Sequence, residues 1–285
     1  MTIELKNIPV VILAGGRGAR FDHESQVKPK PMIEVVGQPM LRQIIDGFIS
    51  QGFREFIVAT GYLGEQIREY FDAVGSKFSF DEDEGIQHTV HHGIMGEPIF
   101  VKCYDTGLES NTGDRVRKLK QVIDGRRFVL TYGDGLSDVN MADVLDHHDW
   151  AHKSWEQERL TGFSPPLVTM TAVRPPGRFG VLEVVSDGEW STNFAAVVKS
   201  FEEKPAQGLI NGGFMVVEPG FITQYLEPYG SLEGDALRRL ASDGLMQAVV
   251  HGGYWRCMDT RRDLEQIEQD VLDGDGRLPW LREKK

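Results

Sequence analysis

The stretch Pro9-Val-Val-Ile-Leu-Ala-Gly-Gly-Arg-Gly-Ala-Arg20 decides how this chain begins to fold. Its first residues are apolar and mostly β-branched, which predicts a buried strand, and the glycines after it predict a loop. Glycine allows the backbone N–H groups of such a loop to come close to a phosphate oxygen. The loop is not a Walker A motif, because no Gly-Lys-Ser/Thr follows, and it lacks the third glycine of a dinucleotide fingerprint. An ordinary strand-to-helix turn is the alternative.

Strand and helix patterns alternate in the first half of the chain. Buried strands are predicted at 9–13, 56–59 and 128–132, and amphipathic helices at 40–50 and around 67–71. Alternation of this kind is typical of α/β proteins, in which helices cover the faces of a parallel sheet. We therefore expect an α/β fold with a mostly parallel central sheet and helices on both faces.

The second half is richer in strand patterns, with glycine and proline between them. Strands are predicted at 167–173, 181–185, 197–201 and 214–217, and helices at 221–226, 236–241 and 264–272. The polar segment 143–166 is expected to form a helix and a surface loop. Because no low-complexity linker divides the chain, we expect a single domain over residues 1–285.

Composition excludes several classes of protein. The chain has 285 residues, is 40% hydrophobic and carries a formal net charge of −12. Sequence-independent binding to nucleic acid or to an anionic membrane needs a broad basic surface, which such a chain does not favour. Cys103 and Cys257 are too few for a disulfide framework. No signal peptide or membrane-length apolar run is present, so we expect a soluble, cytoplasmic protein.

Four cations stand in or just after the glycine-rich loop. Arg17 and Arg20 lie within it, and Lys28 and Lys30 follow in Val27-Lys-Pro-Lys-Pro-Met32. Such a density of positive charge suits a triphosphate, whose charge must be neutralised before an anion can attack it. Solvated basic side chains are the alternative.

Two aspartates follow predicted strands. Asp134 lies in Tyr132-Gly-Asp-Gly135, at the strand edge where open α/β sheets bind ligands. Asp259 precedes a helical pattern. Taken alone, the first is a common Asp-Gly turn and the second a favourable residue at a helix N-terminus. Taken together they predict a shared Mg²⁺ site, since this ion prefers one or two carboxylates with phosphate oxygens and water.

A further group of motifs suits a sugar phosphate. These are Pro175-Pro-Gly-Arg-Phe-Gly180, Ser200-Phe-Glu-Glu-Lys-Pro205 and Ile210-Asn-Gly-Gly-Phe214. Glu203 is placed to hold a sugar hydroxyl and Lys204 a sugar phosphate, and a solvated charge pair is the alternative. The nearby histidines His88, His91 and His92 lack the cysteine or carboxylate pattern that completes a zinc site, so we expect none there.

In this order, the motifs resemble those of the sugar-1-phosphate nucleotidyltransferase family, and most closely its branch of glucose-1-phosphate cytidylyltransferases. The motifs that carry the resemblance are Val27-Lys-Pro-Lys-Pro-Met32, Asp105-Thr-Gly107, Thr131-Tyr-Gly-Asp-Gly135, Pro175-Pro-Gly-Arg-Phe-Gly180, Phe201-Glu-Glu-Lys-Pro205, Ile210-Asn-Gly-Gly-Phe214 and Met258-Asp-Thr260. They extend over nearly the whole chain.

The resemblance implies a Rossmann-like nucleotidyltransferase fold, with a nucleotide-binding half at about 8–135 and a smaller β-rich, sugar-binding half at about 165–272. The implied reaction joins CTP and glucose 1-phosphate to give CDP-glucose and pyrophosphate, through Mg²⁺-assisted in-line attack on the α-phosphorus. The resemblance also implies a homo-oligomer.

Site residues carry over from the family by position. The catalytic positions are Arg20, Lys30 and Asp134, and the metal ligands are Asp134 and Asp259. The nucleotide-binding positions are Leu13, Ala14, Gly15, Gly16, Arg17, Gly18, Ala19, Arg20, Lys30, Ser110, Arg115 and Gly133. The positions for the sugar phosphate are Gly180, Glu203, Lys204, Asn211 and Gly212.

The chain departs from the family pattern at a few places. Ala19 replaces a threonine and Asp114 replaces a glycine, which leaves UTP and dTTP open as nucleotides. Segment 232–237 lacks the usual tryptophan and proline, and 143–166 is longer, which leaves other sugar 1-phosphates open.

Two functions of other classes remain as alternatives. A non-catalytic nucleotide- or sugar-sensing subunit would tolerate loss of Lys30, Asp134 or Asp259, and all three are present. A nicotinamide-dependent oxidoreductase would need an acidic residue after the second strand, where Thr60 and Gly61 stand.

Overall fold

A computed structural model describes residues 4–18, 27–74, 77–81, 86–92, 98–158, 164–175, 180–185, 197–203, 208–226, 230–274, 276 and 278–281. The elements of the first half are η1 (Leu5–Asn7), β1 (Val10–Leu13), η3 (Lys30–Met32), β2 (Glu34–Val35), β3 (Gln38–Pro39), α1 (Met40–Gln51), β4 (Glu55–Thr60), α2 (Gly64–Val74), β5 (Lys77–Asp81), β6 (Ile86–His92), β7 (Pro98–Asp105), α3 (Thr112–Lys118), α4 (Lys120–Ile123), β8 (Phe128–Tyr132) and β9 (Gly135–Ser137).

The elements of the second half are α5 (Met141–Glu158), β10 (Val168–Val173), β11 (Gly180–Val185), β12 (Val197–Glu203), β13 (Ile210–Asn211), β14 (Met215–Val217), the π-helical turns η4 (Ile222–Leu226) and η5 (Leu232–Ala236), α6 (Leu237–Ser242), β15 (Met246–His251), β16 (Trp255–Cys257) and α7 (Arg261–Asp273). The predicted α/β fold class is confirmed, and α5 confirms the predicted helix within 143–166.

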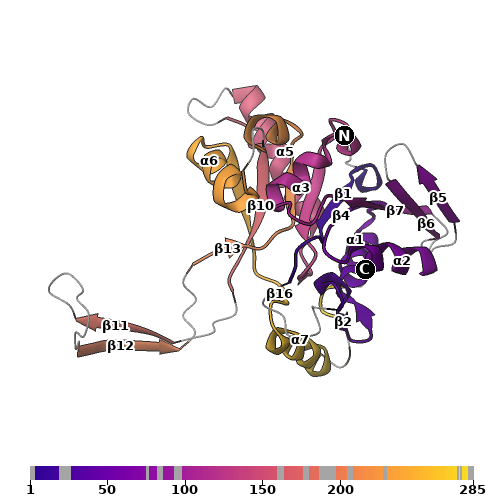
Figure 1. The fold of residues 1–285 in the computed structure, drawn as a ribbon. Helices are drawn as coiled ribbons and strands as arrows, with labels where there is room; N and C mark the ends of the chain where they lie inside the picture. Colours follow the sequence, from indigo (N-terminus) through magenta and orange to yellow (C-terminus); the bar gives the residue numbers. More distant parts are fainter. Residues whose placement is uncertain are drawn as a thin grey trace.

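Four parallel strands form the middle of the main sheet, in the order β8-β1-β4-β7, and of these β1, β4 and β7 are labelled in Figure 1. Val10 of β1 pairs with Phe56 on one side and Val129 on the other. Because these strands are parallel, their carboxyl ends meet at one edge of the sheet. That edge carries the glycine-rich loop and the Tyr132-Gly-Asp-Gly135 turn.

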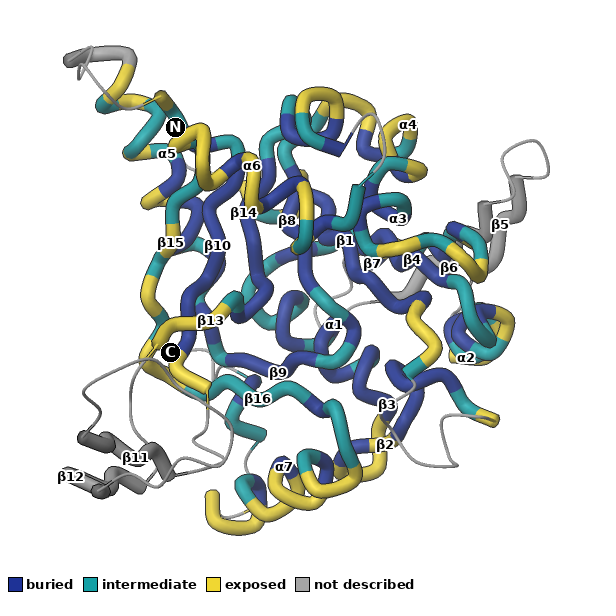
Figure 2. Tube along the Cα trace, turned by 60° about the vertical axis from the view of Figure 1, so that its left-hand side comes forward, coloured by how far each residue is buried: buried dark blue, intermediate teal, exposed yellow. Residues whose placement is uncertain are grey.

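Alternate side chains of β1 enter two different cores. Val10 and Ile12 pack into one hydrophobic cluster, and Val11 and Leu13 pack into another. Successive side chains of a strand point to opposite faces of the sheet, so both faces are covered. Figure 2 shows these central strands as a continuous buried zone. This double burial explains why the strand is an unbroken apolar run without polar alternation.

Helices cover both faces of the sheet, as predicted. The apolar residues of α1, α2 and α7 belong to the first cluster, and those of α3, α4 and α6 to the second. Helix α1 ends at Gly52, whose φ of 112° lies in a region that glycine adopts without steric cost. Helix α7 buries Leu264, Ile267 and Val271 and exposes its outer stripe to solvent (Figure 2).

The second half of the chain extends the same sheet. Strand β14 pairs antiparallel with β8, and β10 follows it, pairing with β13 and in parallel with β15. On the opposite side of the sheet, β6 pairs antiparallel with β7, and β5 pairs antiparallel with β6. The sequence analysis considered the histidines of this region but predicted no strands there. The sheet is thus parallel in the middle and antiparallel at its flanks. Strands β11 and β12 form a separate antiparallel pair.

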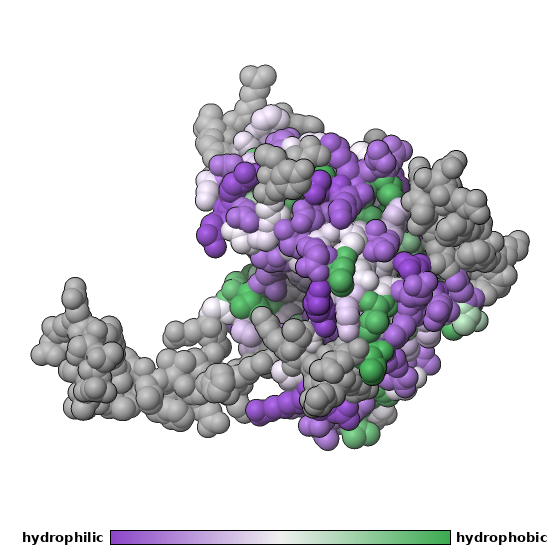
Figure 3. All heavy atoms as spheres, viewed as in Figure 1, coloured by the Kyte–Doolittle hydropathy of each residue, from purple (hydrophilic) through white to green (hydrophobic). Residues whose placement is uncertain are grey.

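Among the described residues, no helix combines the length and apolar character needed to cross a membrane. On the face shown in Figure 3, hydrophilic side chains prevail over the described surface, with smaller hydrophobic patches between them.

Candidate active site

The antiparallel pair of β9 and β16 brings together two aspartates that lie far apart in the sequence. Asp134 stands between β8 and β9, and Asp259 follows β16. Cys257 pairs with Gly135 across the two strands, and the Met258 N–H donates to the Asp134 carbonyl over 2.9 Å. The two carboxylates therefore reach the same place at the carboxyl edge of the sheet.

Lys30 lies between the two carboxylates. Its Nζ is 2.7 Å from Asp134 Oδ2 and 2.7 Å from Asp259 Oδ1, and its side chain is only 10% exposed. It begins the short turn η3, directly after Pro29, whose fixed φ sets the direction in which the chain enters that turn. Two predicted metal ligands and the predicted catalytic lysine thus form one ion cluster.

The helix-terminal role considered for Asp259 belongs instead to its neighbours. Thr260 is the N-cap of α7, where its side chain and that of Asp263 form a capping box. Because this pair satisfies the first backbone N–H groups of the helix, the Asp259 carboxylate is available for the contact with Lys30.

The electrostatics of the cluster favour a charged lysine. Burial by itself lowers the pKa of Lys30, but Asp134 and Asp259 more than offset this, and the pKa lies above its usual value. Two carboxylates and one ammonium leave a net negative charge at this point of the site. That excess suits a divalent cation, which adds positive charge where the chain supplies more negative charge than positive.

The donor set fits a hard cation such as Mg²⁺. One ligand atom each from Asp134, Cys257 and Asp259 lie within 4.8 Å of one another. Burial raises the pKa of the Cys257 thiol, and a hard cation prefers oxygen to sulfur, so the two carboxylates are the favoured ligands. The two carboxylates then supply oxygen ligands, and the remaining positions are open to phosphate oxygens and water, the arrangement that Mg²⁺ favours.

A cleft of about 510 Å³ opens over this cluster. Its lining consists of the glycine-rich loop, the β8–β9 turn, the start of α3 and the ion cluster, namely Leu13, Ala14, Gly15, Gly16, Gly18, Lys30, Pro31, Ser110, Asn111, Thr112, Arg115, Tyr132, Gly133, Asp134 and Asp259. The volume lies in the usual range for sites that take a nucleotide-sized ligand. Of the predicted nucleotide-binding positions, the described ones line this cleft, with Arg17 as the exception.

Arg115 holds the glycine-rich loop in place. Its side chain comes from α3, is almost fully buried, and donates to the Gly15 carbonyl over 2.8 Å. The same guanidinium donates to the Thr60 and Gly107 carbonyls and to the Thr106 hydroxyl. A Cβ on Gly15 would overlap with this guanidinium, which is the physical reason for glycine there. Arg115 was predicted to contact nucleotide, and its main partners in the structure belong to the chain itself.

The other predicted cations are distributed differently. Arg17 is exposed and pairs with Glu109, and Lys28 pairs with Glu34 over 3.1 Å. Arg20 lies outside the described residues, as does Ala19, so their predicted roles stay predictions. Lys30, and not Lys28, is therefore the lysine that the fold directs into the cleft.

Glu233 joins the two halves of the site. Its carboxylate accepts from the Thr112 hydroxyl over 2.6 Å and from the Tyr132 hydroxyl over 2.9 Å. Asn211 in turn donates to the Tyr132 hydroxyl over 3.1 Å. Thr112 and Tyr132 line the cleft, so Glu233 fixes two of its walls and, through Tyr132, the amide of Asn211.

The structure gives roles to the acidic residues that depart from the family pattern, including those of segment 232–237. Asp235 accepts from the backbone N–H and hydroxyl of Ser231, which starts η5. Asp114, which replaces a family glycine, forms a capping box with Asn111 at the start of α3. Both acidic departures therefore serve helix ends.

The positions predicted for the sugar phosphate are placed only in part. Gly180 and Glu203 are register partners in the β11–β12 pair, and Lys204 lies outside the described residues. Asn211 stands at the edge of the main sheet beside Tyr132, and the Gly212 carbonyl accepts from the Trp255 indole over 2.8 Å. The structure thus places Asn211 next to the cleft and leaves the other roles as predictions.

Some residues of the site were not predicted. Tyr132, Thr112 and Pro31 line the cleft, and Glu233 accepts hydrogen bonds from the first two. Tyr132 stands two residues before Asp134 at a strand end, a position that points it toward the same edge of the sheet. For Glu233 no local pattern was available, because its partners lie about a hundred residues away.

Comparison with known proteins gives consistent results. The family model described as nucleotidyl transferase matches residues 9–274. The chain is 37% identical over 276 residues to a glucose-1-phosphate cytidylyltransferase of Salmonella typhi, covering 95% of this chain and 97% of that protein. It is 31% identical over 278 residues to a probable glucose-1-phosphate cytidylyltransferase of Bacillus subtilis, covering 95% and 98%.

Solved structures share the fold. A putative glucose-1-phosphate thymidylyltransferase from Bacillus anthracis, crystallised with sucrose, superimposes with a TM-score of 0.61 at 15% identity, covering 98% of each chain. At this identity the likeness concerns the fold alone.

Proposed function

The chain belongs to the nucleotidyl transferase family, and we propose that it transfers the cytidylyl group of CTP to glucose 1-phosphate, giving CDP-glucose and pyrophosphate. The observation that carries this proposal is the buried Lys30 held between Asp134 and Asp259 at the floor of a cleft with a glycine-rich wall. Relatives named for this activity cover nearly the whole chain, which supports both substrates.

The proposed reaction is a single in-line displacement. An oxygen of the sugar phosphate attacks the α-phosphorus of CTP, a new P–O bond forms, and the bond from the α-phosphorus to the bridging oxygen breaks. Pyrophosphate leaves with the electron pair of that bond. No protein nucleophile is required, so the protein contributes position and charge.

The described residues have distinct parts in this reaction. Space around Gly16 is open, so the loop presents backbone to a triphosphate without a side chain in between. Asp134 and Asp259 would hold Mg²⁺, which when bound would supply positive charge to the reacting phosphates. Lys30 remains charged beside them and stabilises negative charge on the triphosphate. Arg115 keeps the loop in the shape that this requires.

The sugar side of the proposal rests on the family pattern. We propose that Lys204 holds the phosphate of glucose 1-phosphate, and that Glu203, Gly180, Asn211 and Gly212 contact the sugar. The closeness of Asn211 to the cleft wall supports this arrangement. The same chemistry with another sugar 1-phosphate, or with UTP or dTTP, is the alternative, since segments 232–237 and 143–166 depart from the family.

A non-catalytic sensing role is less well supported. Such a subunit has no need to keep a buried lysine between two carboxylates, because that cluster costs desolvation energy. The cluster is intact here. Location in the cytoplasm and assembly into a homo-oligomer stay predictions from the sequence.

The test is a substrate matrix. The protein is incubated with Mg²⁺, each of CTP, UTP, dTTP, ATP and GTP, and a panel of sugar 1-phosphates, and pyrophosphate and nucleotide sugar are both measured. We expect the highest kcat/KM for CTP with glucose 1-phosphate, equal amounts of the two products, and little product from Asp259→Ala. If no combination of nucleotide and sugar 1-phosphate released pyrophosphate, the catalytic proposal would be refuted. If the preferred substrates were not CTP and glucose 1-phosphate, the proposed specificity would be refuted.

A further inference from the structure

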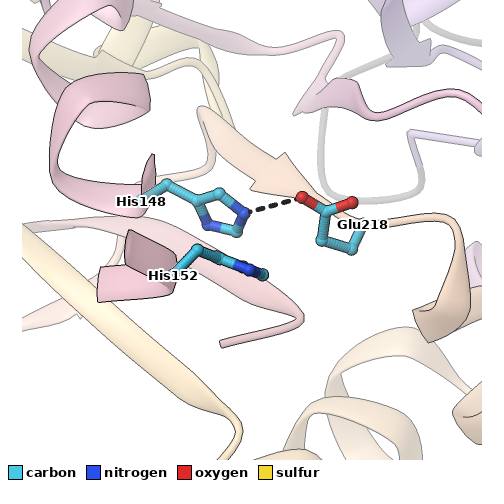
Figure 4. A group of neighbouring side chains, drawn as sticks. All are labelled: His148, His152 and Glu218. Carbon is cyan, nitrogen blue, oxygen red and sulfur yellow. Dashed lines mark hydrogen bonds and ion pairs between the residues drawn. The ribbon is translucent and has the colours of Figure 1, made fainter. Parts of the chain in front are cut away.

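A second cluster of metal-ligating side chains lies outside the cleft. His148 and His152 stand one turn apart on α5, and Glu218 directly follows β14. One ligand atom from each of the three lies within 4.8 Å of the other two. Figure 4 shows His148 projecting from the helix with a ring nitrogen directed at Glu218, and His152 beside it. We propose that these three residues form a second metal site, distinct from the Mg²⁺ site and suited to Zn²⁺.

The spacing of the histidines supports this proposal. Residues four apart lie on the same face of a helix, so two histidines at this spacing can reach one ion. Two imidazoles and a carboxylate are a donor set that binds Zn²⁺ in proteins, with the fourth position left to water. The ring centroids of His148 and His152 are 4.7 Å apart, close enough to share one ion.

Outer hydrogen bonds orient both rings. Nε2 of His152 lies 2.9 Å from the Pro166 carbonyl. A carbonyl oxygen only accepts, so Nε2 carries a proton and Nδ1 is left as the possible ligand atom. Nδ1 of His148 lies 2.7 Å from the Thr169 hydroxyl. A ligating histidine in metal sites is held in this way, with its second nitrogen bonded to an oxygen.

The nitrogen of His148 that would bind the metal donates a hydrogen bond to Glu218 in the structure. Nε2 of His148 is 3.0 Å from Glu218 Oε1, and a carboxylate only accepts, so this nitrogen carries the ring proton. This nitrogen can bind a cation once that proton moves to Nδ1, where the Thr169 hydroxyl accepts it. Binding then changes the tautomer of the ring without releasing a net proton.

The charged groups around these three residues favour a bound cation. Arg127 donates to Glu218 Oε1 over 2.6 Å and also pairs with Asp149. The two carboxylates and one guanidinium leave a net negative charge beside the two imidazole rings. Arg127 and His148 both contact Glu218 Oε1, and the contact with His148 is the one that a metal would replace.

The experiment measures Zn²⁺ directly. The active-site aspartates can also bind this ion, so the full chain carries Asp134→Ala and Asp259→Ala to remove them. Equilibrium dialysis with Zn²⁺ alone, followed by mass-spectrometric metal analysis, should find about one ion per chain. Adding His152→Ala should weaken binding by about a hundredfold or more, because it removes a direct ligand, a larger loss than that of an outer partner.

The control is His147→Ala, since His147 is exposed and stands one residue before His148 on the same helix. It should retain the ion, and Zn²⁺ should raise the unfolding temperature of this control but not of His152→Ala. Circular dichroism checks the fold of each variant. If the aspartate variant does not fold, the measurement uses the native aspartates, and His152→Ala should then remove one of two bound ions. No zinc in the control, or zinc retained after His152→Ala, would overturn the proposal.

Discussion

Arg115→Lys is the substitution that best tests how the cleft is built. In the structure, one buried guanidinium serves four acceptors, which are the carbonyls of Gly15, Thr60 and Gly107 and the hydroxyl of Thr106. Lysine keeps the positive charge but has a single ammonium in place of a planar group with five donors. It cannot reach all four acceptors, so some buried oxygens lose their partner.

The size of the effect follows from these contacts. A hydrogen bond to a charged group contributes about 1.5–3 kcal/mol. The four bonds are not additive, because Nη1 serves three acceptors with two protons. We expect Arg115→Lys to keep about half of the interaction and to lose about 3 kcal/mol of unfolding free energy. At about 2–4 °C per kcal/mol for a chain of this size, Tm should fall by about 6–12 °C.

The assay combines urea unfolding with steady-state kinetics. KM for CTP should rise about tenfold, equivalent to about 1.4 kcal/mol, because the Gly15 carbonyl and the loop around it lose their anchor. The exposed Arg238→Lys is the control, with a change within about 0.5 kcal/mol. If Arg115→Lys left stability unchanged while the affinity for CTP collapsed, Arg115 would contact the nucleotide itself and the anchoring role would be wrong.

Three further predictions concern the charged groups. Asp134→Ala and Asp259→Ala should each lower kcat about a hundredfold or more, since each removes a preorganised charge; pyrophosphate release measures this, and near-normal turnover with an intact fold would contradict it. Lys30→Ala should abolish most turnover, whereas Lys28→Ala, which removes the ion pair with Glu34 outside the cleft, should have a mild effect on turnover. Equal losses of turnover would show that the assignment of the two lysines is wrong. Burial by itself raises the pKa of Glu218, but its basic partners lower it to about 2. Its contribution to stability is therefore complete above about pH 4.5 and is lost as pH falls toward 2, so urea unfolding from pH 6 to pH 3 should show a shallower acid loss in Glu218→Gln than in the native chain.

Much of the central sheet was predictable from local sequence. The runs at 9–13, 56–59 and 128–132 are almost entirely apolar because each strand is buried on both faces. The helix predicted at 40–50 was confirmed as α1, since its apolar spacing and the glycine after it are local signals. The hairpin of β5 and β6 was not predicted, although Lys77-Phe-Ser-Phe-Asp81 alternates polar and apolar residues, because β6 is mostly polar and has no such alternation.

The charged groups proposed to assist the reaction were also identified from the sequence. Lys30, Asp134 and Asp259 stand in short motifs whose glycines, prolines and strand ends can be recognised without a structure. A motif specifies which residue types follow a strand, and strand ends in a parallel sheet share an edge. The sequence therefore determined that this edge would carry phosphate-binding backbone, one lysine and two carboxylates.

Only the tertiary structure decided which groups meet. Asp134 and Asp259 share Lys30 because β9 pairs with β16, a contact between distant segments. Arg115 anchors the loop and does not simply face a ligand, because the carbonyls that it binds come from three separate strand ends. A local pattern shows which residues are neighbours along the chain. The partner of a buried charge depends instead on how distant segments of the chain pack together. That difference is why the sequence identified the charges and the fold alone assigned their partners.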